Sequence, residues 1–282
     1  MAVAIAGASR FVYANGLRHH VLSYGTADDP AVLVLPGITS PAATADFIAS
    51  RIAGLGYSVH VPDYRGRGGS DRALSGGYRL VDYADDVAGL VAALGLRRPI
   101  LIGHSLGARI AAYYATSAAA GDHALVVLVD PPLSGPGRGP YPTPWSSFLA
   151  QLSEAKVGTT ADEVRRFYPK WTERELQIRA EVLAGCDETA IRETYLGFET
   201  EDFFPIWRKV DCPAMLIYGE ESPVVTAAGL AELKAANPDI PCYGVASAGH
   251  MVPWDNTEGF FELLTPIFLE TRRLTTRDTQ QR

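Results

Sequence analysis

Ser105 has the sequence context that most clearly indicates chemistry in this chain. It is the centre of the pentapeptide GHSLG at residues 103–107, which follows the apolar run 99–102 and precedes the helix-like stretch 108–117. Glycine has no Cβ, so the two flanking glycines permit a sharp turn and close packing of a strand against a helix. A serine on such a turn exposes its hydroxyl to a substrate carbonyl. The pattern therefore predicts a nucleophilic serine.

A serine hydroxyl is a weak nucleophile at neutral pH and needs a base within hydrogen-bond reach. His250 is the candidate, because it lies in the loop between the last strand-like run and the last helix-like stretch. The remaining histidines lie in the opening hairpin, in or before strands, or beside the serine itself: His19, His20, His60, His104 and His123. We therefore expect His250 to accept the proton of Ser105.

An imidazole base is in turn oriented by a carboxylate. The strand-like run 125–129 ends at Asp130, and a carboxylate at a strand tip can reach the histidine. Asp130 also precedes two prolines, where an aspartate often initiates a turn without any catalytic role. We expect Asp130 to be the acid, with Glu221 or Glu220 as the alternative.

Attack on a carbonyl creates an oxyanion, which backbone N–H groups commonly stabilise. One donor is expected from Leu106, the residue after the nucleophile. The second is expected from the loop that follows the strand-like run 31–35. Within that loop we choose Ile38 and keep the hydroxyl of Thr39 as a further contact.

Strand-like and helix-like segments alternate along the chain. Short apolar runs lie at 31–35, 58–61, 99–102, 125–129, 214–218 and 242–246. Most are continuous, which is typical of parallel strands buried on both faces. Helix-like patterns lie between them at 44–55, 80–96, 106–119, 226–236 and 257–270. Two earlier runs flank Asn15-Gly16, a strong hairpin signal. The predicted fold class is α/β, a mostly parallel doubly wound sheet opened by an antiparallel hairpin.

One long segment, 132–208, contains no predicted core strand. It opens with a stretch rich in proline and glycine and continues with helix-like blocks at 145–155, 160–167, 172–184 and 188–198. We expect an inserted helical cap (132–208) over the strand ends, where α/β proteins bind ligands. The core would then consist of 1–131 and 209–282. The polar tail 271–282 is expected to fray.

The composition of the chain argues against nucleic-acid-binding, membrane-spanning and zinc-binding proteins. The net charge is −7 and no block of lysine or arginine occurs, so no nucleic-acid partner is expected. No apolar stretch reaches the roughly 18 residues of a membrane span, and the first residues lack the basic start of a signal peptide. Cys186, Cys212 and Cys242 fit no zinc spacing. We expect a cytoplasmic enzyme, without membrane, metal or cofactor, that acts on a small molecule as a monomer or small homo-oligomer.

These motifs resemble the α/β-hydrolase fold superfamily over roughly residues 10–270. The serine pentapeptide, the loop DYRGRGGS at 63–70 and the pair Gly249-His250 match its pattern. In that superfamily the triad order along the chain is serine, acid, histidine. The acid commonly follows the penultimate strand, a place occupied here by Ser222, which cannot stabilise an imidazolium as a carboxylate does.

Three stretches, 35–44, 130–138 and 248–255, resemble more narrowly the N-formylmaleamate deformylases of aerobic nicotinate degradation. This resemblance implies a triad of Ser105, Asp130 and His250, and hydrolysis of N-formylmaleamate to maleamate and formate through a formyl-serine. The implied substrate carries a carboxylate, so a cation or several N–H donors should face it. The candidate substrate-binding residues are Gly37, Thr39, His104, Arg138, Tyr141, Trp145 and Trp254.

Arg138, close to Asp130 in sequence, is a candidate cation for that carboxylate. Arg165, Arg166 and Arg179 belong to predicted cap helices, where a solvated surface role is expected instead. The alternative function on the same triad is a carboxylesterase, lactonase or C–C bond hydrolase acting on another small carboxylated substrate. A non-catalytic ligand receptor is a second class, and the intact serine–histidine pair argues against it.

Overall fold

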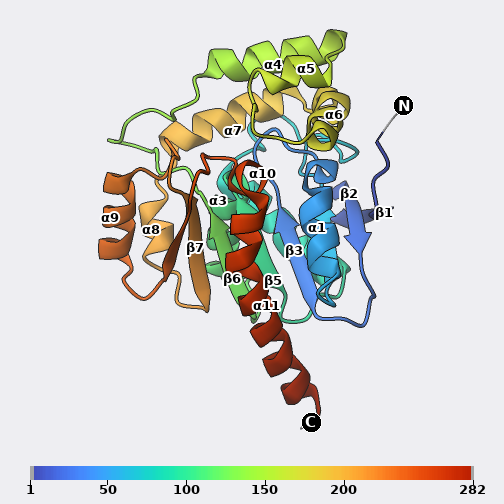
Figure 1. The fold of residues 1–282 in the computed structure, drawn as a ribbon, viewed down its shortest axis with the longest axis vertical. Helices are drawn as coiled ribbons and strands as arrows, with labels where there is room; N and C mark the ends of the chain where they lie inside the picture. Colours follow the sequence, from blue (N-terminus) through green and yellow to red (C-terminus); the bar gives the residue numbers. More distant parts are fainter. Residues whose placement is uncertain (1–2, 281–282) are drawn as a thin grey trace.

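The computed structural model describes residues 3–280, and within them eight strands form one sheet in the order β1-β2-β4-β3-β5-β6-β7-β8 (Figure 1). The strands are β1 (Ala8–Ala14), β2 (Leu17–Tyr24), β3 (Ala31–Leu35), β4 (Ser58–Pro62), β5 (Ile100–His104), β6 (Leu125–Val129), β7 (Ala214–Gly219) and β8 (Cys242–Val245). β2 pairs antiparallel with β1 and β4, and all other pairs are parallel. The predicted fold class is therefore confirmed.

The opening hairpin turns at Asn15-Gly16, as predicted. Both residues have positive φ, +48° and +74°, and Ala14 pairs directly with Leu17. A two-residue hairpin loop of this type needs positive φ at both positions, which asparagine and glycine tolerate better than other residues. The local sequence thus decides where β1 ends and β2 begins.

Two hydrophobic cores lie on the two faces of the sheet. Along β3, Val32 and Val34 join one core while Leu33 and Leu35 join the other. Because successive side chains of a strand point to opposite faces, a strand buried on both sides must be apolar throughout. This explains the continuous apolar runs of the sequence.

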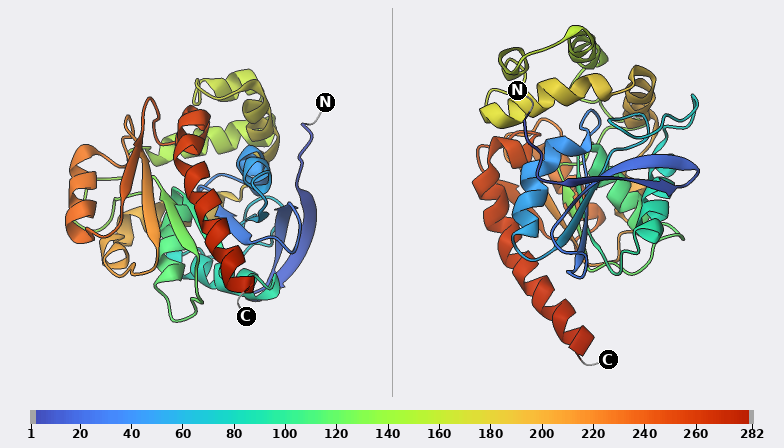
Figure 2. Two further views of the ribbon diagram at one scale, coloured as in Figure 1. Left: turned by 60° about the horizontal axis from the view of Figure 1, so that its bottom comes forward. Right: turned by 90° about the vertical axis from the view of Figure 1, so that its right-hand side faces the viewer.

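Helices cover both faces (Figure 2). The helices α1 (Asp46–Ala53) and α11 (Thr257–Gln280) contribute to one core. The helices α2 (Leu80–Ala93), α3 (Leu106–Ala115) and α9 (Ala227–Ala236) contribute to the other. Two short helices, η1 (Ala42–Ala45) and α10 (Val252–Asp255), follow β3 and β8.

The helices between β6 and β7 are α4 (Trp145–Val157), α5 (Ala161–Arg165), α6 (Glu173–Val182), η2 (Leu183–Gly185), α7 (Glu188–Thr200) and α8 (Phe204–Trp207). In Figure 1, α4 to α7 gather above the end of the sheet at which α3 and α10 begin. α8 instead packs against α9 and α3. The division into a core and a cap with a boundary at 208 stays a prediction.

The last helix extends further than the sequence indicates. The tail 271–282 was expected to fray, but α11 continues to Gln280, and residues 281–282 lie outside the described part. The helix starts on buried Phe260 and Leu264, and no glycine or proline interrupts it after residue 270, so propagation adds one hydrogen bond per residue. Neither α11 nor any other helix within residues 3–280 is long and apolar enough to cross a membrane.

Candidate active site

Ser105 lies on the turn from β5 to α3. Its φ is +56° and its ψ is −116°, a backbone conformation that non-glycine residues rarely adopt. Its backbone N–H donates to the carbonyl of Val129 at 2.8 Å, which ties the turn to the end of β6. The neighbouring strand therefore holds the serine in its strained position.

The two glycines of the pentapeptide are required by close backbone packing. A Cβ on Gly103 would lie 2.1 Å from the carbonyl oxygen of Gly107. A Cβ on Gly107 would lie 1.9 Å from the carbonyl oxygen of Leu35. Both distances are far below van der Waals contact, so only glycine lets α3 approach β5 and β3 this closely.

Ser105, His250 and Asp130 form one chain of hydrogen bonds, although they come from three different loops. Ser105 Oγ lies 2.9 Å from His250 Nε2, and His250 Nδ1 lies 2.7 Å from Asp130 Oδ2. A carboxylate only accepts, so His250 Nδ1–H donates to it and Nε2 is left to accept from the serine hydroxyl. Such an arrangement can activate a serine nucleophile.

Asp130 is completely buried and follows β6 with a φ of +48°. Besides the histidine, it accepts hydrogen bonds from the hydroxyl of Ser222 at 2.6 Å and from the N–H of Gly219 at 3.2 Å. The alternative Glu221 instead forms a 2.8 Å ion pair with Lys170, and the carboxylate that is hydrogen-bonded to the histidine is that of Asp130. Among the predicted acids, the structure brings Asp130 to the imidazole.

The two predicted oxyanion donors belong to segments near the serine. Ile38 lines the pocket beside Ser105, and Leu106 is the first residue of α3. Two buried arginines hold the loop of Ile38 through successive carbonyls: Arg67 donates to Ile38 O at 3.1 Å, and Arg179 donates to Thr39 O. The conformation of this loop therefore depends on two cations in the protein interior.

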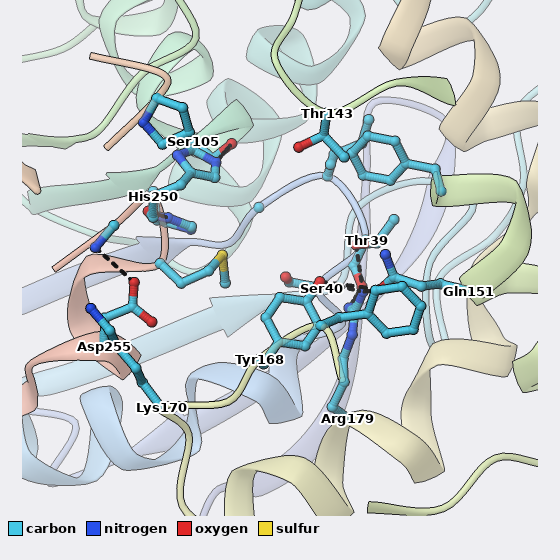
Figure 3. Close-up of a pocket in the computed structure, with 18 of the residues that line it drawn as sticks. Thr39, Ser40, Ser105, Thr143, Gln151, Tyr168, Lys170, Arg179, His250 and Asp255 are labelled. Atoms are coloured by element: carbon cyan, nitrogen blue, oxygen red, sulfur yellow. Dashed lines mark hydrogen bonds between the residues drawn. The ribbon is translucent and has the colours of Figure 1, made fainter. Parts of the chain in front are cut away.

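A pocket of about 350 Å³ opens beside the serine and histidine (Figure 3). Its lining comes from the loop after β3, the serine turn, α4 and the loop before it, α6 and the loop before it, the loops that follow β7 and β8, and α10. Its size suits a small organic molecule. Within the described residues, no group of three or more His, Cys, Asp or Glu side chains gathers as a metal ion would require.

Four of the candidate substrate-binding residues line this pocket: Gly37, Thr39, His104 and Tyr141. The hydroxyl of Tyr141 lies 3.2 Å from His250 Nε2. Burial raises the pKa of Tyr141 far above its usual range, so the phenol stays protonated and can donate a hydrogen bond.

His104 supports the loop that carries the catalytic histidine candidate. Its Nε2–H donates to the backbone carbonyl of His250 at 2.8 Å, and its ring lies 5.3 Å from that of Trp254. Burial, helped by the neighbouring His250, lowers the pKa of His104 to about 3. His104 is therefore neutral near pH 7 and adds no charge beside the serine.

Three candidate substrate-binding residues do not line the pocket. Arg138 pairs with Glu232 at 2.5 Å and lies over the ring of Phe204, so its charge is already neutralised elsewhere. Trp145 packs against the ring of Tyr195 at 5.7 Å. Trp254 stacks on the ring of Trp171 at 5.3 Å. The two indoles take part in the packing of α4 on α7 and of the loop before α6 on α10.

The surface role expected for Arg179 is wrong. The side chains of Arg165 and Arg166 are 40% and 59% exposed, but Arg179 is only 2% exposed and lines the pocket. A signal was present in the sequence, because Arg179 lies three residues after buried Leu176 on α6 and four residues before buried Leu183, which follows the helix directly. The sequence also indicated Tyr168 as one of several aromatic residues that could line the pocket, which it does, but gave no signal for the pocket residue Gln151.

Comparison with known proteins agrees with this geometry. The α/β hydrolase fold family matches residues 30–257. The chain is 40% identical to N-formylmaleamate deformylase of Pseudomonas putida KT2440 over 261 residues, covering 93% of this chain and 96% of the relative. It is 32% identical to 2-(acetamidomethylene)succinate hydrolase of Mesorhizobium japonicum, covering 79% of this chain and 82% of the relative.

A solved structure is also similar. The crystal structure of an N-formylmaleamic acid deformylase from Pseudomonas putida S16 superposes with a TM-score of 0.82 and 39% identity, over 90% of this chain and 99% of that one. The fold, the strained serine turn and the similarity over nearly the full length of the chain all assign this protein to one family. This chain is an enzyme of the α/β-hydrolase fold family.

Proposed function

We propose that this chain hydrolyses N-formylmaleamate to maleamate and formate, with Ser105, His250 and Asp130 as its catalytic triad. The observation that carries the proposal is the continuous chain of hydrogen bonds from serine to carboxylate at the wall of a small pocket. The similarity to the Pseudomonas putida deformylase over 93% of this chain supports the substrate.

In the first half of the reaction, Ser105 Oγ attacks the formyl carbon while His250 Nε2 accepts the hydroxyl proton. Buried Asp130 stabilises the imidazolium that forms. The oxyanion is stabilised by the N–H groups of Ile38 and Leu106, and each such donor is worth roughly 3 kcal/mol of the barrier. The C–N bond then breaks, and the imidazolium protonates the departing nitrogen to give maleamate.

In the second half, a water molecule attacks the formyl ester on Ser105. His250 Nε2 accepts a proton from this water and returns a proton to the serine oxygen as the ester bond breaks. Formate leaves and the starting enzyme is restored. The substrate suits this route, because the departing nitrogen is flanked by a second carbonyl that delocalises its charge, and a formyl carbon is sterically open.

A direct assay tests the function. The purified protein is incubated with N-formylmaleamate, and formate and maleamate are measured together. We expect the two products in equal amounts, and no release above background from Ser105→Ala, which should remain folded. The parallel substrates are 2-(acetamidomethylene)succinate, whose acyl group is acetyl instead of formyl, and p-nitrophenyl acetate.

The alternative remains a carboxylesterase, lactonase or C–C bond hydrolase on the same triad. Turnover of esters without any release of formate from N-formylmaleamate would favour that alternative. Substantial turnover in Ser105→Ala would remove the serine from its proposed role.

A further inference from the structure

Arg179 is a buried cation in the pocket wall, and no acidic side chain forms an ion pair with it among residues 3–280. Its guanidinium donates to the carbonyl of Thr39 and, at 2.8 Å, to the hydroxyl of Thr39. Gln151 Oε1 and the hydroxyl of Tyr168 lie at 3.5 and 3.4 Å, too far for strong hydrogen bonds, and Nε has no partner in the described part (Figure 3). The guanidinium therefore has an N–H donor without an acceptor, and no acidic side chain in the described part neutralises its charge.

The neighbouring cations differ from Arg179 in this respect. Lys170, which also lines the pocket, forms a 2.8 Å ion pair with Glu221. Arg174, on the same helix, pairs with Asp46 and Glu175 and is 39% exposed. Within the described part of the chain, Arg179 is thus the pocket cation that lacks an acidic partner.

Burying a positive charge without a counter-ion is strongly unfavourable, and a ligand carboxylate would supply the missing charge. A planar guanidinium also binds a carboxylate through two parallel hydrogen bonds. We propose that Arg179 binds the carboxylate of the substrate, with Tyr168 and Gln151 beside it. The identity of that substrate rests on the proposed function, whereas the ligand class, a small carboxylate, follows from the pocket itself.

The same guanidinium connects substrate binding to the reaction centre. Thr39, which it contacts twice, follows Ile38, one of the two proposed oxyanion donors. A substrate whose carboxylate binds Arg179 is therefore held at one end while its acyl carbon is presented to Ser105. Anchoring of this kind lowers the entropic cost of reaching the reactive geometry, so Arg179 should select for charge at the far end of the substrate.

The first test compares a charged with an uncharged substrate. Arg179→Gln and Arg179→Lys are assayed on N-formylmaleamate and on the analogue in which a methyl group replaces the carboxylate. We expect Arg179→Gln to lower kcat/KM for the charged substrate about 10- to 100-fold, mainly through KM, with a smaller loss for the lysine variant. For the uncharged analogue, kcat/KM should fall clearly less, because this substrate loses only the support that Arg179 gives to the loop of Thr39 and no contact with a carboxylate. Arg166→Gln, which removes an exposed cap arginine, is the matched control.

A second variant keeps Arg179 and its contacts with Thr39. Gln151→Glu is nearly isosteric and places a carboxylate next to the guanidinium, where it competes with the ligand. We expect a rise in KM for N-formylmaleamate and little change for the uncharged analogue. An arginine that only held the loop would not respond to this substitution.

Calorimetric titration with maleamate measures the same site without turnover. We expect weaker binding to Arg179→Gln and Gln151→Glu than to the unmodified protein and Arg166→Gln. This measurement retains its meaning if N-formylmaleamate proves not to be a substrate. Equal losses for charged and uncharged substrates, or unchanged maleamate affinity in both pocket variants, would overturn the proposal.

Discussion

Asp130 and Ser222 come from the ends of two neighbouring strands and meet beside the imidazole of His250. Asp130 reaches the imidazole from the end of β6 with positive φ, while Ser222, after β7, donates to the same carboxylate oxygen that faces the histidine. The serine hydroxyl also accepts from the backbone N–H of Val224. In the proposed triad, the carboxylate of Asp130 orients the base, and the hydroxyl of Ser222 orients the carboxylate.

We expect Asp130→Asn to lower kcat by about four orders of magnitude, because an amide cannot stabilise the imidazolium and favours the wrong tautomer of His250. Ser222→Ala should cost less than about tenfold, since it removes one of three hydrogen bonds to the carboxylate. Steady-state kinetics on both variants decide this. The acid assignment fails if Asp130→Asn retains more than a tenth of normal turnover.

At the level of secondary structure, the serine turn depends on three segments whose backbones are in direct contact. β3, β5 and α3 meet where Gly103 and Gly107 face neighbouring carbonyls. The strained serine at this junction is held by a backbone hydrogen bond to β6. The position of Ser105 is therefore set by backbone packing and not by a flexible loop.

Gly107→Ala should destabilise the protein by about 3 kcal/mol or more, because the new Cβ would meet the backbone of Leu35, which cannot move without disturbing β3. Gly139→Ala is the control, since a Cβ there meets nothing within 4 Å and its φ is not positive. Urea unfolding followed by circular dichroism compares the two. Equal stabilities would contradict the packing argument.

At the scale of the whole molecule, the sheet buries histidines on both sides of its centre. Burial lowers the pKa of His60 to about 4, helped by nearby Arg10, and that of His104 to about 3. Arg10 donates to His60 Nδ1 at 3.2 Å, which requires a neutral acceptor nitrogen there. Both side chains are therefore folded into the protein in their neutral form.

This burial predicts a loss of stability on mild acidification. In the unfolded chain a histidine has a pKa of about 6.5, so below that pH the unfolded state binds protons that the folded state does not. The free energy of unfolding should keep its full value above about pH 6.5 and decrease as the pH falls towards 4. The decrease is at most about 1.4 kcal/mol per pH unit for each histidine. Urea unfolding at pH 7.5, 6 and 5 measures this. His60→Gln should show a shallower decline, and an identical slope would contradict the assignment.

The sequence by itself determined the strands, the hairpin turn and the serine turn. These features depend on residue types at fixed short spacing: Asn15-Gly16 accepts positive φ, and the glycines around Ser105 leave room for a turn. The sequence also indicated that His250 and Asp130 would lie near Ser105, with Glu221 or Glu220 left open as the acid, because parallel strands all end at the same edge of a sheet.

Only the tertiary structure decided which cation faces the pocket. Arg138 lies close to Asp130 in sequence but pairs with Glu232, whereas Arg179 contacts Thr39, a residue 140 positions earlier in the chain. Proximity along the chain does not measure proximity in space once a segment folds over the sheet. Whether a charged side chain is solvated or buried depends on the surface that its helix meets, and that surface is formed by residues distant in sequence.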